Sequence, residues 1–362
     1  MYQNELNALT KSGRYRSRML FDEALLDFSS NDYLGLAHLK ALFERAVTQV
    51  SMYASHAPKA SLLVNGYHPI HEEFEQFLVR QNGFEAALVC GSGFLANFSL
   101  IEALPRKKDL LLLDEEYHAS GVVASKTVDA KVLFFRHNDA NHLEELLKTN
   151  PHQRAIVAVE GIYSMSGDLM SRAIFDVADA HNAILIVDEA HSVGVVGENL
   201  RGVFDLFGIA PKENHIKMGT LGKALGSYGA YILCSNTLSD FLLNRAKALI
   251  YTTAPSLFDI ALGYQGFLYL LKHKEALRGA IQERQRIVKV MLGIETNGLI
   301  VPFKPRDRDV LALQNTLQAE GFLVGAIRPP TVKEPIIRLI PRLEYSTQTL
   351  ETLCTLLQKE SA

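Results

Sequence analysis

A lysine in a glycine-rich stretch is the residue of this sequence with the most specific chemical potential. Lys223 lies within residues 220–230 (TLGKALGSYGA), and it follows Asp188 and His191, which come at the end of the apolar run 183–187 (AILIV). A lysine amine can form a Schiff base with the aldehyde of pyridoxal phosphate (PLP), and a carboxylate can pair with the pyridinium nitrogen of that cofactor. The pattern therefore predicts a PLP-dependent enzyme in which Lys223 serves as covalent anchor and as base.

The elements that must position these residues alternate between short apolar runs and helical patterns. Apolar runs that end at polar residues lie at 86–89, 110–113, 132–135, 155–159 and 183–187. Such runs are typical of parallel strands that are buried on both faces. The polar residues that follow them would lie at the carboxyl ends of the strands, where open α/β sheets bind ligands. We therefore expect an α/β fold with a large, mostly parallel sheet.

The C-terminal third of the sequence has a different pattern. A long helical stretch begins at about residue 254 and is followed by a helix at 310–319, strands at 322–327 and 336–340, and a final helix at 347–358. This order predicts a smaller α+β domain. We divide the chain into an N-terminal arm (1–38), a large PLP-binding domain (39–268) and a small C-terminal domain (269–362).

Composition and charge exclude several classes of function. The chain has 362 residues, of which 48% are hydrophobic and 21% charged, so it can bury a large core. Its formal net charge is -3, and the basic residues are spread along the sequence. A protein without a concentrated positive charge is not expected to bind nucleic acid or an anionic membrane surface.

The cysteines and the N-terminus indicate the compartment. Cys90, Cys234 and Cys354 are odd in number and far apart, and their spacing does not match a metal site. We expect three reduced, buried thiols and no metal. The first residues lack the apolar core of a signal peptide, and no apolar stretch is long enough to span a bilayer. The expected location is the cytoplasm.

Three motifs now give the sequence a family resemblance. Residues 27–36 (DFSSNDYLGL), 220–226 (TLGKALG) and 326–332 (AIRPPTV) resemble the α-oxoamine synthase family of fold-type I PLP enzymes, and the resemblance covers nearly the whole chain. It implies a PLP-dependent transferase of fold type I. It also implies that Asp188 keeps the pyridine nitrogen protonated and that His191 donates a hydrogen bond to the phenolic oxygen of PLP. Without the family match, Asp188 and His191 could instead be a helix-capping pair.

Gly93 and Phe94 are candidate phosphate-binding residues. They follow the apolar run 86–89, where a strand gives way to a helix. Free backbone N–H groups and the positive end of the helix dipole can bind a phosphate there. A tight turn that needs glycine is compatible with the same sequence.

The resemblance implies further contacts with the cofactor. Thr220 would bind its phosphate, and Thr252 and Thr253 would reach the phosphate in the neighbouring subunit of a homodimer with shared active sites. His118 would stack on the pyridine ring and contact the acyl substrate, and Ser164 would be another cofactor contact. Ser164 could also be a turn serine that bonds its own backbone, and His118 an ordinary satisfied histidine.

Arg338 is the main candidate for substrate binding. It lies between aliphatic residues of a predicted strand, where an arginine needs a partner for its donors. The family provides the α-carboxylate of an amino acid as that partner, and an internal salt bridge is the alternative. Thr331 matches a substrate-binding threonine. Arg14, in a cluster of basic residues near the N-terminus, could meet the far end of an acyl chain or simply be solvated.

The resemblance also implies a reaction. The segments 31–33 (NDY) and 327–332 (IRPPTV) favour a family member that condenses L-alanine with a pimeloyl thioester in biotin biosynthesis and releases carbon dioxide. The acyl group would arrive on coenzyme A or on an acyl carrier protein. Two alternatives remain open: another α-oxoamine synthase such as glycine C-acetyltransferase, and a catalytically idle homologue that acts as a subunit.

One segment departs from the family pattern. Residues 57–63 (APKASLL) replace a run of glycines and serines. Pro58 fixes its backbone φ angle and the added side chains fill space, so we expect this loop to follow a different course. Acyl-chain specificity is the property that this change puts in question.

Overall fold

The computed structural model, which describes residues 1–306 and 309–359, contains one large seven-stranded sheet. Its strands lie in the order β2-β8-β7-β6-β5-β3-β4. They are β2 (Ala86–Cys90), β3 (Leu110–Asp114), β4 (Lys131–Phe135), β5 (Ala155–Glu160), β6 (Ile184–Asp188), β7 (His215–Thr220) and β8 (Ala230–Cys234). In this sheet β8 runs in the direction opposite to that of the other six strands. The mostly parallel sheet predicted from the sequence is thus confirmed.

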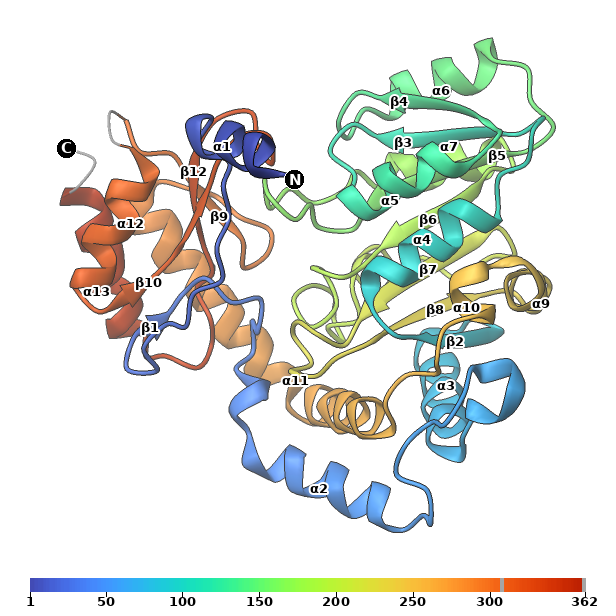
Figure 1. Cartoon of the computed structure of the whole chain (residues 1–362), viewed down its shortest axis with the longest axis horizontal. Coiled ribbons are helices and arrows are strands. Elements are labelled where there is room, and N and C mark those ends of the chain that lie inside the picture. Colours follow the sequence, from blue (N-terminus) through green and yellow to red (C-terminus); the bar gives the residue numbers. More distant parts are fainter. Residues whose placement is uncertain (307–308, 360–362) are drawn as a thin grey trace.

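Helices cover both faces of this sheet (Figure 1). One face packs against α4 (Gly93–Ala103), α5 (Ala119–Ala124), α9 (Asn236–Arg245) and α10 (Lys247–Ile250). The other packs against α3 (Pro69–Asn82), α6 (Ala140–Thr149), α7 (Ala173–Ala180), α8 (Val203–Phe207) and α11 (Leu257–Leu292), and α2 (Lys40–Ser51) packs on α11. Apolar side chains occupy both faces of the sheet. Because most strands are parallel, the polar residues that end them gather at the carboxyl end of the sheet.

One strand differs from its prediction. We expected residues 132–135 to be buried on both faces, but β4 is one of the two edge strands of the sheet. Its residues are largely exposed or half-buried, and Phe134 is 46% exposed. An apolar run alone does not distinguish a central strand from an edge strand, so this part of the prediction is wrong.

The C-terminal part of the chain forms a separate core. Strands β9 (Val301–Phe303), β11 (Gly325–Ile327) and β12 (Ile336–Leu339) make an antiparallel sheet in the order β11-β12-β9, and α12 (Val310–Ala319) and α13 (Thr347–Lys359) pack with it. The single strand predicted over 322–327 is wrong. Its first half, β10 (Phe322–Leu323), leaves this sheet because it pairs with β1 (Leu26–Asp27).

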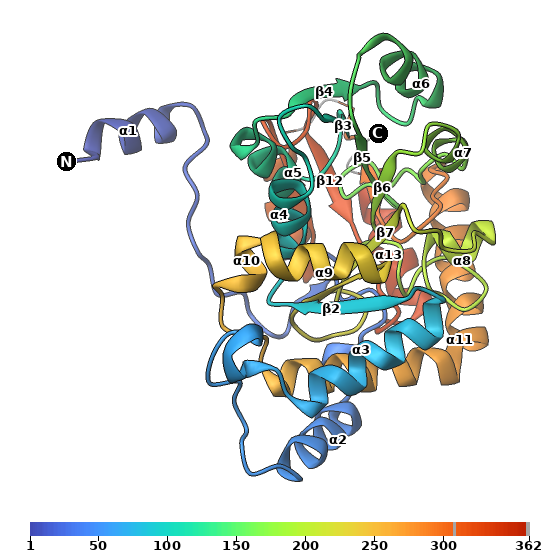
Figure 2. The same ribbon diagram turned by 90° about the vertical axis from the view of Figure 1, so that its right-hand side faces the viewer.

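The N-terminal segment lies apart from both cores. Residues 1–24 are exposed, and helix α1 (Gln3–Lys11) buries none of its side chains. Figure 2 shows α1 standing away from the body at the end of an extended segment. Our division at residues 38 and 268 stays a proposal, because β1 pairs with the C-terminal part and α11 passes through residue 268.

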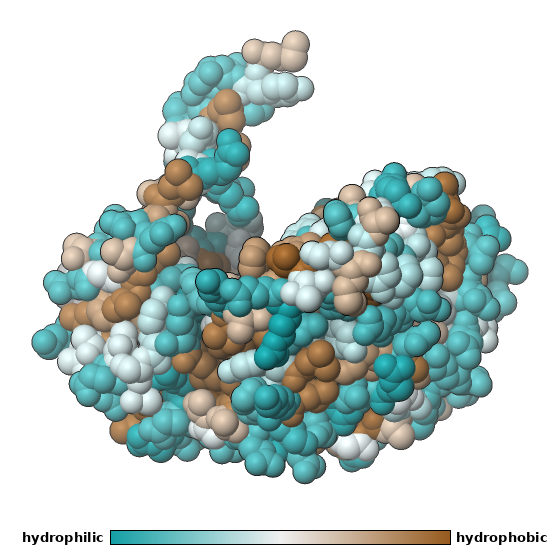
Figure 3. Space-filling model, turned by 90° about the horizontal axis from the view of Figure 1, so that it is seen from below, coloured by the Kyte–Doolittle hydropathy of each residue, from teal (hydrophilic) through white to brown (hydrophobic). Residues whose placement is uncertain are grey.

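The surface carries no broad apolar band on the side seen in Figure 3. Hydrophilic residues cover most of this side, hydrophobic residues form several small groups among them, and the N-terminal segment projects from the body. Within the described residues, no helix has both the length and the apolar character needed to cross a membrane.

A close backbone approach fixes the loop that carries Lys223. Gly226 has a φ of 62°, and its amide donates to the Lys223 carbonyl over 3.0 Å. A Cβ atom on Gly226 would lie 2.4 Å from the Ala37 nitrogen and 2.7 Å from the Leu36 carbonyl carbon. Glycine is therefore required where this loop packs against residues 36–37.

We expect Gly226→Ala to lower the free energy of unfolding by about 2–4 kcal/mol, because the new methyl group collides with backbone atoms at a positive φ. Gly279→Ala is the matched control. No atom lies within 4 Å of a Cβ at Gly279, and this residue is inside α11, so alanine should stabilise by up to about 1 kcal/mol. Urea unfolding measures both changes, and equal stability of Gly226→Ala and the wild type would contradict the packing described here.

Candidate active site

Lys223 occupies the turn between β7 and β8, at the carboxyl end of the parallel strands. Its Nζ atom lies 2.6 Å from His191 Nε2. Burial lowers the pKa of Lys223 to about 8, although the nearby Asp188 and Glu160 act in the opposite direction. A lysine with such a pKa is partly neutral near pH 7, as a nucleophile or base requires.

Asp188 ends β6 and is held by donors on both carboxylate oxygens. Asn97 Nδ2 donates to Oδ2 over 2.6 Å, and the Ala190 amide donates to Oδ1 over 2.9 Å. The Tyr117 hydroxyl in turn donates to Asn97 Oδ1 over 2.8 Å, which fixes the orientation of the amide. Asp188 is 5% exposed. A buried carboxylate with this support suits the pyridinium nitrogen of PLP.

Two histidines flank Lys223. His191 is hydrogen-bonded through Nδ1 to the Tyr33 hydroxyl, and burial together with Lys223 lowers its pKa well below the usual value. His118 caps the start of α5, where its Nδ1 lies 3.2 Å from the Ser120 amide. Burial lowers the pKa of His118 more than Asp188 raises it. Both imidazoles are therefore neutral near pH 7.

Gly93 and Phe94 form the first turn of α4, as the sequence predicted. Ser92 caps this helix by accepting from the Leu95 amide over 3.2 Å, and among the described residues no acceptor faces the amides of Gly93 and Phe94. Thr220 lies beside them, since a Cβ on Gly93 would be 3.6 Å from Thr220 Cβ. Two free amides and a helix N-terminus fit a phosphate group, whereas the Thr220 hydroxyl donates to the Gly229 carbonyl over 2.9 Å and would have to rotate to bind a phosphate.

Arg338 lies on β12 of the small sheet and contacts the loop that follows β5 at the carboxyl end of the large sheet. Its Nε donates to the Ser164 carbonyl over 2.8 Å and its Nη1 to Asn31 Oδ1 over 3.0 Å. The buried Nη2 has no hydrogen-bond partner in the described part of the chain, although the Tyr33 hydroxyl lies near the guanidinium group, and no ion pair of Arg338 with a carboxylate is found there. The internal salt bridge that we considered is therefore absent among these residues, which leaves the charge of Arg338 available to a ligand.

The structure does not bring every predicted residue to this cluster. Thr331 and Arg14 are exposed, and the Arg14 amide closes the turn after α1 on the Leu9 carbonyl. Thr252 donates to the Ala248 carbonyl over 2.6 Å, and Thr253 forms an isolated bridge with Ser61. Their contact with a neighbouring subunit stays a prediction, which mixing of Lys223 and Thr252/Thr253 variants would test by recovered activity.

The loop at residues 57–63, which departs from the family pattern, is held by the bridge between Ser61 and Thr253. The Ala254 amide donates to the Ala60 carbonyl over 3.0 Å, and Leu62–Gly66 form one turn of π-helix. Lys59 adopts a φ of 66°. The loop therefore packs beside the segment that carries Thr252 and Thr253, while its effect on acyl-chain specificity stays a prediction.

Sequence reasoning missed several residues of the site. Glu160 ends β5 beside Asp188, Tyr33 contacts His191, and Asn97 contacts Asp188. Glu160 could have been found, because it follows an apolar run in the same way as Asp188 does. Tyr33 and Asn97 lie far from their partners in sequence, and no local pattern indicates those contacts.

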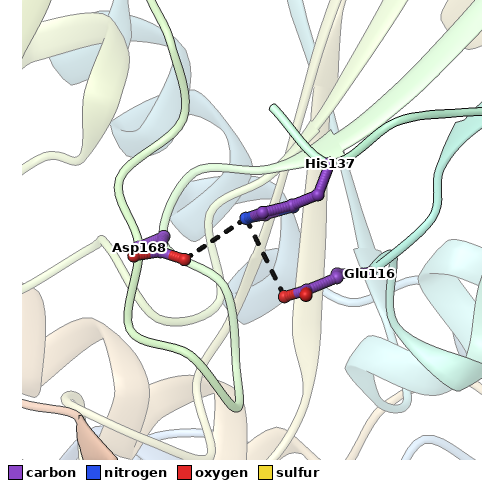
Figure 4. Close-up of side chains that lie close together, drawn as sticks. All are labelled: Glu116, His137 and Asp168. Carbon is purple, nitrogen blue, oxygen red and sulfur yellow. Dashed lines mark hydrogen bonds and ion pairs between the residues drawn. The ribbon is translucent and has the colours of Figure 1, made fainter. Parts of the chain in front are cut away.

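A second cluster supports the loop that carries Ser164. Figure 4 shows Glu116, His137 and Asp168 close together. His137 Nε2 lies 3.3 Å from Asp168 Oδ2, and its Nδ1 lies 2.9 Å from Asp114 Oδ1. Burial alone would lower the pKa of His137, but the hydrogen bonds with Asp114 and Asp168 raise it to about 10. A protonated imidazole that donates from both nitrogens accounts for the arrangement.

Comparison with known proteins agrees with this geometry. The model of the aminotransferase class I and II family matches residues 23–357. The 8-amino-7-oxononanoate synthase of Helicobacter pylori is 43% identical over 360 residues, with 99% of this chain and 96% of that protein aligned. The enzyme of the same name from Methylobacterium nodulans is 38% identical over 334 residues, with 90% and 83% aligned.

Solved structures share the fold. Serine palmitoyltransferase of Sphingomonas wittichii superposes with a TM-score of 0.88 at 24% identity, over 99% of this chain and 95% of that chain. The 8-amino-7-oxononanoate synthase from Francisella tularensis superposes with a TM-score of 0.77 at 24% identity, over 94% and 98%.

The fold and the site together define a PLP-dependent enzyme of fold type I, as the sequence predicted. The chain belongs to the aminotransferase class I and II family, and within it to the α-oxoamine synthases. The residues fit the cofactor: Lys223 can anchor its aldehyde, Asp188 can pair with its ring nitrogen, and the start of α4 can hold its phosphate.

The raised pKa of His137 predicts a pH-dependent stability. The ion pairs of His137 contribute fully to the free energy of unfolding below the unfolded-state pKa of 6.5. This contribution is lost as the pH rises toward about 10, at up to about 1.4 kcal/mol per pH unit. We therefore expect His137→Gln to be much less stable than the wild type at pH 6, with a gap that shrinks by pH 10. His56→Gln, at an exposed histidine, is the control. A gap that did not change with pH in urea unfolding would contradict the charged cluster.

Proposed function

We propose that the protein is an 8-amino-7-oxononanoate synthase, which condenses L-alanine with a pimeloyl thioester in biotin biosynthesis. The observation that carries this proposal is the 43% identity to a relative of that name across 99% of the chain. The site supports it through Lys223, Asp188 and the unpaired Arg338, since an amino-acid substrate brings the carboxylate that Arg338 lacks.

The proposed reaction has a simple balance. A bond forms between the α-carbon of alanine and the thioester carbonyl, and the carbon–sulfur bond breaks to release a thiol. The bond from the α-carbon to its carboxylate then breaks to release carbon dioxide. When bound, PLP supplies a protonated ring that accepts electrons from the α-carbon.

The residues of this chain would divide the remaining work. Arg338 orients the α-carboxylate by charge-assisted hydrogen bonds, because its buried Nη2 is otherwise unsatisfied. Lys223, with a pKa of about 8, accepts the α-proton in its neutral form and can return a proton to the product. Asp188 keeps its negative charge at the end of β6 through the Asn97 and Ala190 donors. His118 contributes a neutral ring beside this site.

The test is a product assay with the purified PLP-loaded enzyme. We expect L-alanine and pimeloyl thioester to give carbon dioxide and the amino ketone, with glycine and short acyl thioesters much less effective. Parallel reactions with coenzyme A and acyl carrier protein thioesters identify the acyl donor. Lys223→Ala should lose at least about 100-fold in rate, while Lys126→Ala, at an exposed lysine, should not. Preferred use of glycine with an acetyl thioester would identify a glycine C-acetyltransferase instead, and no turnover with any pair would indicate an idle homologue.

A further inference from the structure

Glu160 is a buried carboxyl group that the mechanism above does not use. It ends β5 directly beside Asp188 at the end of β6, and the two residues are register partners in neighbouring parallel strands. Glu160 is 1% exposed and Asp188 is 5% exposed. Two carboxyl groups so close together in a dry site do not both ionise, so one of them is expected to hold a proton.

The hydrogen-bond donors identify which carboxyl group that is. Asp188 accepts hydrogen bonds on both oxygens, from Asn97 Nδ2 and from the Ala190 amide. Glu160 accepts on Oε2 only, from the Ser164 amide over 2.9 Å. Its Oε1 is buried and has no partner among the described residues. Donors stabilise the ionised form, so the negative charge belongs on Asp188 and the proton on Glu160.

The groups that face Glu160 support the same assignment. Asp188 on β6 and Asp114 on β3 are anions, and Lys223 after β7 and Arg338 on β12 are the nearby cations. The hydroxyls of Tyr33, Tyr117 and Tyr163 complete the surroundings. Burial and Asp188 together outweigh Lys223 and raise the pKa of Glu160 well above its usual value.

Ser164 connects Glu160 with Arg338. The amide of Ser164 is bound by Glu160 Oε2, and its carbonyl accepts from Arg338 Nε over 2.8 Å. An ionised Glu160 would attract the guanidinium group and compete for its charge. A neutral Glu160 holds the Ser164 backbone without that competition.

We propose that Glu160 is a positioning residue that acts in its protonated form: it fixes the Ser164 backbone against Arg338 and leaves the charge of Arg338 free for the carboxylate of the amino-acid substrate. The second half rests on the proposed function, because it requires an amino acid as substrate. The first half concerns the protein alone.

Stability of the apoprotein tests the protonation state without any ligand. Above the unfolded-state pKa of a glutamate the unfolded chain releases a proton that native Glu160 keeps, so the wild type loses stability as the pH rises. Glutamine matches a protonated carboxyl group in shape and does not titrate. The urea midpoint of Glu160→Gln should therefore increase relative to the wild type between pH 5 and pH 8, while Glu145→Gln, at an exposed glutamate, should show no such trend.

The opposite trend would overturn the proposal. An ionised, stabilised Glu160 would make the glutamine variant less stable than the wild type, with a gap that widens as the pH rises. Failure of Glu160→Gln to fold would count against a neutral Glu160 in the same way, since the amide can replace every hydrogen bond of the protonated acid.

Kinetics of the PLP-loaded enzyme test the link to Arg338. Glu160→Gln should keep kcat and the KM for L-alanine within about threefold of the wild type, while Glu160→Ala should raise that KM by about tenfold or more, because Ser164 and Arg338 lose their support. The KM for L-alanine should also rise more steeply at alkaline pH in the wild type than in the glutamine variant, which shares every other titrating group. A glutamine variant as impaired as the alanine variant would contradict the proposal. If the enzyme used another substrate pair, the apoprotein result would still stand, so the two failures can be told apart.

Discussion

The buried charge of Asp188 is the interaction on which the rest of the site depends. A carboxylate at 5% exposure is costly unless donors replace the lost water, and Asn97 and Ala190 provide them. Asn97 is in turn held by Tyr117 from the segment after β3. The helix α4 therefore has two tasks: its first turn offers free amides for a phosphate, and its next turn fixes the anion at the end of β6.

The surrounding groups limit the number of charges that act on this anion. The protonated His137 balances Asp114 and Asp168 outside the site, and the neutral His191 and His118 add no charge within it. Lys223 is a cation on which Asp188 acts, and Arg338, bound through Nε to the Ser164 carbonyl, is the second cation of the site. This arrangement keeps Asp188, which neutral donors hold in place, apart from Arg338, which we propose binds the amino-acid carboxylate.

The sequence predicted the parts of this structure that have a local signal. Lys223 lies in a recognisable glycine-rich loop, and Asp188 follows an apolar run that had to be a buried strand. Contacts between distant segments had no such signal: Tyr33 contacts His191, 158 residues away in sequence, and Gly226 packs against residues 36–37. Edge position also escaped the pattern, since β4 has the same apolar character as the central strands. The strand predicted at 322–327 divides because β1, from the other end of the chain, pairs with its first half.

The central claim is that the charge of Asp188 controls chemistry at the α-carbon of the amino acid. The most direct measurement is the exchange of the α-proton of L-alanine with deuterium from solvent, catalysed by the PLP-loaded enzyme and followed by NMR. Asp188→Asn keeps the shape of the side chain and removes its charge, and Asp176→Asn, at an exposed aspartate of α7, is the control. We expect exchange by Asp188→Asn to fall by about 100-fold or more with the cofactor still bound. Exchange at a near wild-type rate would contradict the account.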